Sequence, residues 1–126
     1  MKKILITGSL GYIGTVLYQH LTEHGYSVYG IDNGAFEDCL LAPSLEQQVV
    51  YKNIKNITEG DLTGYDVIIH LSGLQNDPLN DTYPGKLYDV EHEYSVFIAR
   101  CCKKMNTKFI YASSCSVYGY ADTDRF

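Results

Sequence analysis

The sequence has 126 residues, of which 45% are hydrophobic and 20% are charged, and its formal net charge is −5. This length and balance predict a single globular domain with a buried core and exclude an intrinsically disordered chain. The acidic balance excludes a nucleic-acid partner, whose phosphates require a basic surface, and no apolar run approaches the roughly 18 residues of a membrane helix.

Five short apolar runs have the length and composition of buried strands. In chain order they are residues 3–7, 27–31, 49–51, 66–71 and 108–112. Two segments between them, at 12–23 and at about 87–105, carry apolar residues at helical spacing. A brief helical turn is expected at 58–63, and the prolines, Asn and Asp residues of 75–85 predict a loop.

The order of these elements predicts the fold class. Apolar runs that alternate with helices are typical of a parallel sheet that is buried on both faces. We therefore expect an α/β fold, a Rossmann-like doubly wound parallel sheet of about five strands in the order 3-2-1-4-5. The whole of residues 1–126 is expected to form this one domain.

A glycine-rich segment joins the first strand to the first helix. It reads Thr7-Gly8-Ser9-Leu10-Gly11-Tyr12-Ile13-Gly14. The first glycine permits a tight turn, the second lets the backbone approach a pyrophosphate, and the third lets the helix pack closely on the strand. The backbone amides of Tyr12 and Ile13, at the positive end of the helix dipole, are then expected to face the phosphates.

An acidic residue follows the second strand. Asp32 lies 18 residues beyond Gly14, where a carboxylate accepts both ribose hydroxyls of NAD and repels the 2′-phosphate of NADP. No arginine comes directly after Asp32 to bind that phosphate, so the sequence predicts NAD as the cofactor. A Walker-type phosphate loop is excluded, because no Gly-Lys-Ser/Thr follows the glycines.

The cysteines and histidines predict no metal site. Cys39, Cys101, Cys102 and Cys115 lack the spacing of metal-binding pairs, and the adjacent pair is expected on one helix as ordinary thiols. His20 and His24 share a helix face but have no third ligand nearby, so a solvated surface is the better interpretation. The apolar run at 4–6 is too short for a signal peptide, so we expect a reducing, cytoplasmic setting.

With these motifs in place, the chain resembles the extended short-chain dehydrogenase/reductase family over essentially its whole length. Within that family it is similar to the NAD-dependent epimerase/dehydratase group, which acts on nucleotide sugars. Residues 30–33 resemble the segment that contacts the adenosine ribose, and residues 70–73 resemble the His-Leu-Ala-Ala below the nicotinamide-side ribose. Residues 109–119 resemble the strand that carries the catalytic serine or threonine, which makes Ser114 the matching hydroxyl.

The resemblance implies a set of site residues. The cofactor contacts would be Gly8, Gly11, Tyr12, Ile13, Gly14, Asp32, Asn33, Asn53, Ile54, Leu71, Ser72 and Gly73. In such enzymes a tyrosine, activated by a lysine, removes a proton from a sugar hydroxyl while NAD takes the hydride. Ser114 would hydrogen-bond the oxygen on which charge develops, whereas the structural alternative is a hydroxyl that caps the end of a strand.

Three departures from the family pattern bear on activity. The Tyr-x-x-x-Lys that should follow Ser114 is not found after it, and the match at Tyr51 and Lys55 precedes the serine, so we treat it as chance. Residues 52–56 read Lys-Asn-Ile-Lys-Asn instead of Gly-Asp-Ile-Arg-Asp, so Asn53 brings an amide where a carboxylate is usual. Glu91 stands where an asparagine usually supports the active site.

The leading hypothesis is the amino-terminal, NAD-binding portion of a nucleotide-sugar epimerase or dehydratase, truncated before its substrate-binding part. Without the tyrosine and lysine, this chain is expected to bind the dinucleotide but to turn over little, with a nucleotide sugar as the partner of the complete enzyme. The alternative is a stand-alone NAD-binding or regulatory module without catalysis. Apolar surface that a missing portion would cover predicts a homo-oligomer or other self-association.

Overall fold

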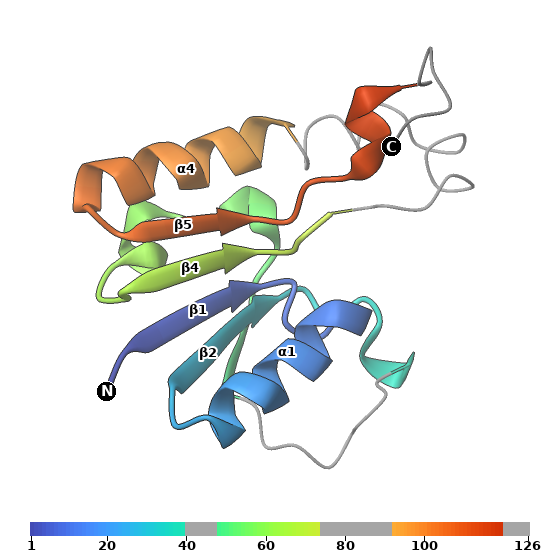
Figure 1. The fold of residues 1–126 in the computed structure, drawn as a ribbon, viewed down its shortest axis with the longest axis vertical. Helices are drawn as coiled ribbons and strands as arrows, with labels where there is room; N and C mark the ends of the chain where they lie inside the picture. The colour runs from blue at the N-terminus through green and yellow to red at the C-terminus, as the bar shows by residue number, and fades with distance from the viewer. Residues whose placement is uncertain (40–47, 74–91, 120–126) are drawn as a thin grey trace, which may run out of the picture.

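The computed structural model describes residues 1–39, 48–73 and 92–119, and it contains one parallel sheet with helices on both faces (Figure 1). The strands are β1 (Lys3–Thr7), β2 (Ser27–Asp32), β3 (Val49–Tyr51), β4 (Val67–His70) and β5 (Lys108–Tyr111). Their order is β3-β2-β1-β4-β5, and all four pairings are parallel, which confirms the predicted topology.

Among the described residues, two α-helices and three short 3-10 turns lie between the strands, and a fourth 3-10 turn follows β5. The helices are α1 (Tyr12–Glu23) and α4 (Tyr94–Met105), and the turns are η1 (Glu37–Cys39), η2 (Ile54–Asn56), η3 (Glu59–Leu62) and η5 (Cys115–Tyr118). The described part of the second helix thus ends where the sequence predicts. Its predicted beginning at 87–91, including Glu91, and the predicted loop at 75–85 lie outside the described residues.

The sheet has a hydrophobic layer on each face because side chains alternate along each strand. On β1, Leu5 belongs to the layer that includes Ile98 of α4, whereas Ile4 and Ile6 belong to the layer that includes Tyr18 of α1. Leu5 and Ile6 are fully buried, and burial of such a side chain contributes about 1.5–3 kcal/mol to stability. The two helices therefore cover opposite faces of the sheet.

Two details of the core differ from the sequence prediction. The edge strands are exposed in this chain, as Tyr51 on β3 and Ile110 on β5 show with exposures of 63% and 41%, so burial on both faces holds only for the central strands. On α4, the helical spacing predicts that Phe97 lies on the inner face with Ile98 and Cys101, but Phe97 is 36% exposed, and Cys102 is buried with the other two instead. The helical period alone did not fix how α4 is rotated about its axis.

The parallel arrangement brings the carboxyl ends of all five strands to one edge of the sheet. In Figure 1 the arrowheads of the labelled strands point to this edge, which lies on the right of the view. Thr7 and His70 are paired across β1 and β4, and Asp32 is paired with Tyr51 across β2 and β3. In open parallel sheets this edge is where ligands bind.

Candidate functional site

The glycine loop leaves no room for side chains at its first and third glycines. Gly8 has a φ of +75°, and a Cβ atom on it would lie 2.9 Å from the backbone nitrogen of Ser72. A Cβ atom on Gly14 would lie 2.1 Å from the carbonyl oxygen of Gly8, which is closer than any real contact. The loop is also tied to the sheet, because the amide of Gly8 donates to the carbonyl of Ile31 at 2.8 Å. The loop therefore packs closely against both α1 and the segment after β4, as its glycine spacing predicts.

The amino end of α1 is arranged to receive an anion. Gly11 is the N-cap and has no side chain to satisfy the first amides of the helix, and the first turn carries no acidic residue. The amides of the first turn have no partner within a helix, and the helix dipole places partial positive charge there. Tyr12 and Ile13 are exposed at 77% and 62%, so solvent and ligands reach this turn.

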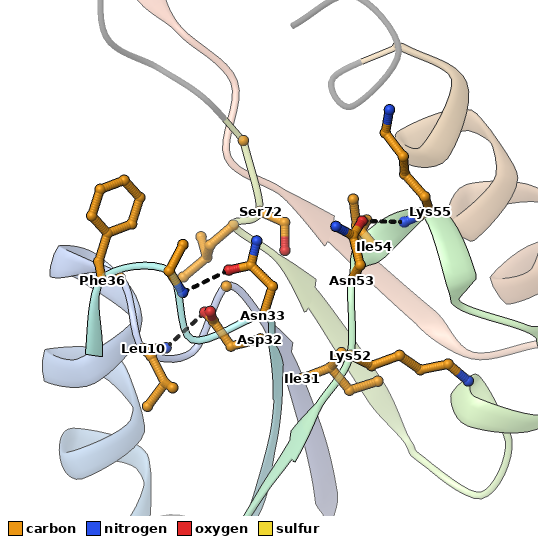
Figure 2. A pocket seen from close by; sticks show the side chains of 15 residues that line it. Leu10, Ile31, Asp32, Asn33, Phe36, Lys52, Asn53, Ile54, Lys55 and Ser72 are labelled. Carbon is orange, nitrogen blue, oxygen red and sulfur yellow. Dashed lines mark hydrogen bonds between the residues drawn. The ribbon is translucent and has the colours of Figure 1, made fainter. Parts of the chain in front are cut away.

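Asp32 is held in place by backbone amides (Figure 2). Its Oδ2 accepts a hydrogen bond from the amide of Leu10 at 3.0 Å, and its Oδ1 accepts one from the amide of Gly34 at 2.9 Å. The neighbouring Asn33 accepts from the amide of Ala35 at 3.0 Å. Each carboxylate oxygen keeps a lone pair for another donor, so the side chain is both fixed in orientation and able to accept from a hydroxyl pair.

The loops at the carboxyl edge enclose a groove with two lobes. We call them the Asp32 lobe, of about 410 Å³, and the His70 lobe, of about 520 Å³. They share the glycine loop and residues 71–73 as a common wall. Asp32, Asn33, Asn53 and Ile54 line the Asp32 lobe, whereas Tyr12, Ile13 and Gly14 line the His70 lobe. All of the residues predicted to contact the cofactor therefore lie around this groove, and the contacts themselves stay predictions.

Sequence reasoning missed several residues that line the groove. Phe36 lines both lobes and Cys39 lines the His70 lobe. Both come from residues 35–48, where no periodic pattern marks a structural role. Tyr111 at the end of β5 also lines the His70 lobe, which follows from the strand order once β5 is placed beside β4.

Lys52 lines the Asp32 lobe, but its charge is directed elsewhere. Its Nζ lies 2.6 Å from Oδ2 of Asp61, and Figure 2 shows the side chain running away from Asp32. The hydrogen bond from Lys52, together with that from Thr58, lowers the pKa of Asp61 to about 2. The charge of Lys52 is therefore paired with a carboxylate outside the lobe.

Ser114 lies just beyond β5 and is exposed. Its carbonyl accepts from the amide of Val117 at 3.3 Å. The residue that lines the His70 lobe at this point is Ser113, not Ser114. The catalytic role of Ser114 stays a prediction.

Tyr51 does not have the properties of a general base, although Lys55 follows it at the family's spacing. It lies on the edge strand β3, and 63% of it is exposed. Partial desolvation, a hydrogen bond with Glu37 and the charges of Glu37 and Asp32 raise its pKa. An activated tyrosine needs a lowered pKa, so the interpretation of this match as chance agrees with the structure.

His70 joins three elements beneath the groove. It is 1% exposed, its Nδ1 lies 2.6 Å from Oγ1 of Thr7, and its Nε2 lies 2.8 Å from Oγ of Ser95 on α4. Its ring stacks with those of Phe109 and Tyr111 at centroid distances of 6.2 and 5.7 Å. Burial lowers the pKa of His70 to about 4. The histidine is therefore neutral at physiological pH, and its hydrogen bonds connect β1, β4 and α4, which is a structural role.

This lowered pKa predicts a pH-dependent loss of stability. Because the unfolded pKa is near 6.5 and the folded value is about 4, the folded chain binds fewer protons in this window. The contribution of His70 to the free energy of unfolding is fully present above pH ~6.5 and falls by about 3 kcal/mol as the pH drops to about 4. In urea unfolding at several pH values, His70→Gln should show a shallower decline than the parent chain. His24 is exposed, so His24→Gln should lose stability with falling pH as much as the parent chain does. If His70→Gln also lost as much, the lowered pKa of His70 would be contradicted.

The described part of the chain contains neither a cluster of metal-binding side chains nor a membrane-spanning helix. Residues 1–39, 48–73 and 92–119 contain no group of three His, Cys, Asp or Glu side chains that could hold a metal ion. The rings of His20 on α1 and of His24 at its C-cap form a tilted pair with centroids 4.2 Å apart, and Nδ1 of His24 lies 2.7 Å from the carbonyl oxygen of His20. None of the helices described is long and apolar enough to cross a membrane.

The sequence has relatives among known nucleotide-sugar enzymes. A UDP-glucose 4-epimerase of Pisum sativum is 31% identical over an aligned length of 139 residues, and the match covers 94% of this chain and 38% of that protein. An ADP-L-glycero-D-manno-heptose-6-epimerase of Thiobacillus denitrificans is 28% identical over 123 residues, which cover 91% of this chain and 36% of that protein.

Solved structures agree with these sequence relatives. UDP-N-acetylglucosamine 4-epimerase from Methanobrevibacter ruminantium M1, in complex with UDP-N-acetylmuramic acid, matches with a TM-score of 0.85 at 27% identity, over 99% of this chain and 42% of that one. The NAD-dependent NDP-hexosamine 5,6-dehydratase TunA matches with a TM-score of 0.85 at 26% identity, over 98% of this chain and 41% of that one.

The chain thus spans between 36% and 42% of the length of these four relatives. Residues 4–125 match the family described as the NAD dependent epimerase/dehydratase family. This match covers nearly the whole chain and agrees with the resemblance that the glycine loop and Asp32 indicate. The chain therefore belongs to the NAD dependent epimerase/dehydratase family.

Proposed function

We propose that the groove binds NAD across its two lobes. The adenosine ribose would bind Asp32, the pyrophosphate would bind the amides at the start of α1, and the nicotinamide half would extend into the His70 lobe. The observation that carries this proposal is the carboxylate of Asp32, which two backbone amides hold in place. It lies beside a glycine loop that packs so closely on the segment after β4 that a Cβ atom on Gly8 would be 2.9 Å from the backbone nitrogen of Ser72. An acid so placed is the ribose-binding element of a dinucleotide fold.

The carboxylate of Asp32 favours NAD over NADP. A 2′-phosphate would lie against the carboxylate of Asp32, and such like-charge contacts are unfavourable. Lys52, which lines the lobe, is paired with Asp61 and points away from Asp32 (Figure 2). Compensation by Lys52 would require breaking a 2.6 Å ion pair.

The complete protein is proposed to interconvert or dehydrate a nucleotide sugar by transient hydride transfer through a keto-sugar intermediate. The relatives named above are epimerases and a dehydratase of UDP-, ADP- and NDP-sugars, and the chain shares their fold. When bound, NAD supplies the hydride acceptor. In this portion of the protein the groove orients the dinucleotide, and Ser114 is proposed to hydrogen-bond the reacting oxygen.

The 126-residue chain is proposed to be catalytically incomplete, because no Tyr-x-x-x-Lys follows Ser114 within it. With NAD and UDP-glucose, we expect binding of NAD but no NADH absorbance and no UDP-galactose, since the tyrosine and lysine that would remove the hydroxyl proton do not follow Ser114 in this sequence. A longer protein that contains the missing pair should produce one of these two signals. Turnover by the 126 residues alone would contradict the proposed division of roles.

The exposed end of the sheet is proposed to cause self-association of this chain. Ile110 and Tyr111 on the edge strand β5 are 41% and 44% exposed, and Val117 and Tyr118 on η5 are 69% and 88% exposed. An apolar edge that has no further strand beside it among the described residues favours pairing with a second copy. In size-exclusion chromatography with light scattering, the chain should form dimers or larger species as its concentration rises. Ile110→Lys should shift it toward monomer, whereas Val16→Lys, 55% exposed on α1, should not.

A further inference from the structure

We infer that Asn33 is a site of self-modification, at which its side-chain amide is lost as ammonia and a new carboxylate enters the Asp32 lobe. Asn33 is exposed, lines this lobe and is followed by Gly34. A backbone nitrogen attacks the side chain of the asparagine before it most readily when its own residue is glycine, which has no side chain to obstruct the approach. The chemical step requires only this chain, whereas its effect on cofactor binding rests on the proposed function.

The side chain of Asn33 is folded toward the nitrogen that would attack it. Its Oδ1 accepts a hydrogen bond from the amide of Ala35 at 3.0 Å (Figure 2). This bond reaches two residues along the chain, so it holds the side chain over the peptide bond whose nitrogen belongs to Gly34. The amide of Ala35 also stabilises the negative charge that develops on Oδ1 during the attack.

Asp32 provides a proton acceptor for the attacking nitrogen. The amide of Gly34 donates to Oδ1 of Asp32 at 2.9 Å. Because an amide nitrogen must lose its proton as it forms a new bond to carbon, a carboxylate on that N–H acts as a general base. The fold therefore places a base at the nucleophile and a hydrogen-bond donor at the carbonyl that is attacked.

The reaction has two steps. The nitrogen of Gly34 bonds to Cγ of Asn33 and passes its proton to Asp32, and the bond from Cγ to Nδ2 then breaks as Nδ2 takes that proton and leaves as ammonia. Water opens the resulting cyclic imide and reaches it because Asn33 is exposed. Opening at one carbonyl gives aspartate and opening at the other gives isoaspartate, so water is consumed and ammonia is released. Either product has a carboxylate where Asn33 had a neutral amide.

Asn53 is a control within the same chain. Its Oδ1 accepts from the amide of Lys55 at 3.0 Å, which is the same kind of bond across two residues. The residue between them is Ile54, however, and its branched side chain crowds the nitrogen that would have to attack. We therefore expect Asn53 to stay intact under conditions in which Asn33 is converted.

The test follows the masses of proteolytic peptides while the chain is kept near neutral pH, both folded and unfolded in urea. The folded chain should convert Asn33 at least as fast as the unfolded chain does, and Asn53 should not change. Asp32→Asn should slow the conversion of Asn33 at least about tenfold. Asp38→Asn, which removes an exposed acid on η1 that lines neither lobe, should leave the rate unchanged. Slower conversion of Asn33 in the folded chain than in the unfolded chain, or equal rates in the two variants, would overturn the inference.

The effect on binding is measured by calorimetric titration with NAD. Asn33→Asp carries the charge of the aspartate product beside Asp32, and a dinucleotide brings two phosphate charges, so this variant should bind NAD about tenfold more weakly. Asn56→Asp adds the same charge at an exposed position on η2 that lines neither lobe, and it should bind NAD as the parent does. Equal affinities of the parent and Asn33→Asp would overturn the effect on binding. Absence of NAD binding by the parent would overturn the proposed function, whereas the peptide masses decide the modification separately.

Discussion

Gly14→Ala should destabilise the chain by about 3 kcal/mol, even though alanine is the better helix former by about 1 kcal/mol. Gly14 lies in the first turn of α1, where a Cβ atom would be 2.1 Å from the carbonyl oxygen of Gly8 and 2.8 Å from Cα of Ser9. Both neighbours are backbone atoms, which cannot turn aside as a flexible side chain does. The clash therefore outweighs the gain in helix propensity, and urea unfolding followed by circular dichroism measures the difference.

Gly60→Ala is the control for this prediction. Gly60 lies in η3, and a Cβ atom on it would have only Oγ1 of Thr58 near it, at 3.6 Å, which is an ordinary contact. We expect its free energy of unfolding to change by less than about 1 kcal/mol, in the stabilising direction if at all. If Gly14→Ala were as stable as Gly60→Ala, the close packing of α1 on the glycine loop would be wrong.

Asp32→Asn should weaken NAD binding by about ten- to a hundredfold, because a hydrogen bond to a charged group contributes about 1.5–3 kcal/mol. Asparagine has one oxygen where the carboxylate has two, so it cannot accept from both Leu10 and Gly34 and also from the ribose hydroxyls. Loss of the negative charge should also reduce the discrimination against NADP. Titration of the variant with both cofactors measures the two effects.

Asp38→Asn is the matched control for Asp32→Asn. Asp38 is an exposed acid on η1, a few residues along the chain, and it lines neither lobe. Asp38→Asn removes the same charge from the same region, and it should change neither the affinity for NAD nor the preference for NAD over NADP appreciably. Equal effects of the two substitutions would mean that general charge, rather than the position of Asp32, governs binding.

The sequence predicted those parts of the fold in which the local hydrophobic pattern agrees with the tertiary structure. The central strands are continuous apolar runs, and the strand order follows from the alternation of strands and helices. The glycine spacing in 7–14 identified the close packing of Gly8 and Gly14, because no other residue fits such a loop. Asp32 was found from its place at the end of a strand, which in a parallel sheet determines the edge on which it lies.

Other parts of the groove depend on contacts between distant residues, which no local pattern encodes. His70 hydrogen-bonds Thr7 and Ser95, which are 63 and 25 residues away in sequence. The ion pair of Lys52, just after β3, with Asp61 of η3 depends on how these two segments lie relative to one another. The exposure of Phe97 reflects the rotation of α4, which its period does not determine.

Calorimetric titration of the chain with NAD and with NADP tests the central claim most directly. A fixed carboxylate at Asp32, beside amides at the start of α1, predicts that NAD binds at a single site and that NADP binds at least about tenfold more weakly. No binding of either cofactor would contradict the claim that the groove is a dinucleotide site. Tighter binding of NADP than of NAD would contradict the role given to Asp32.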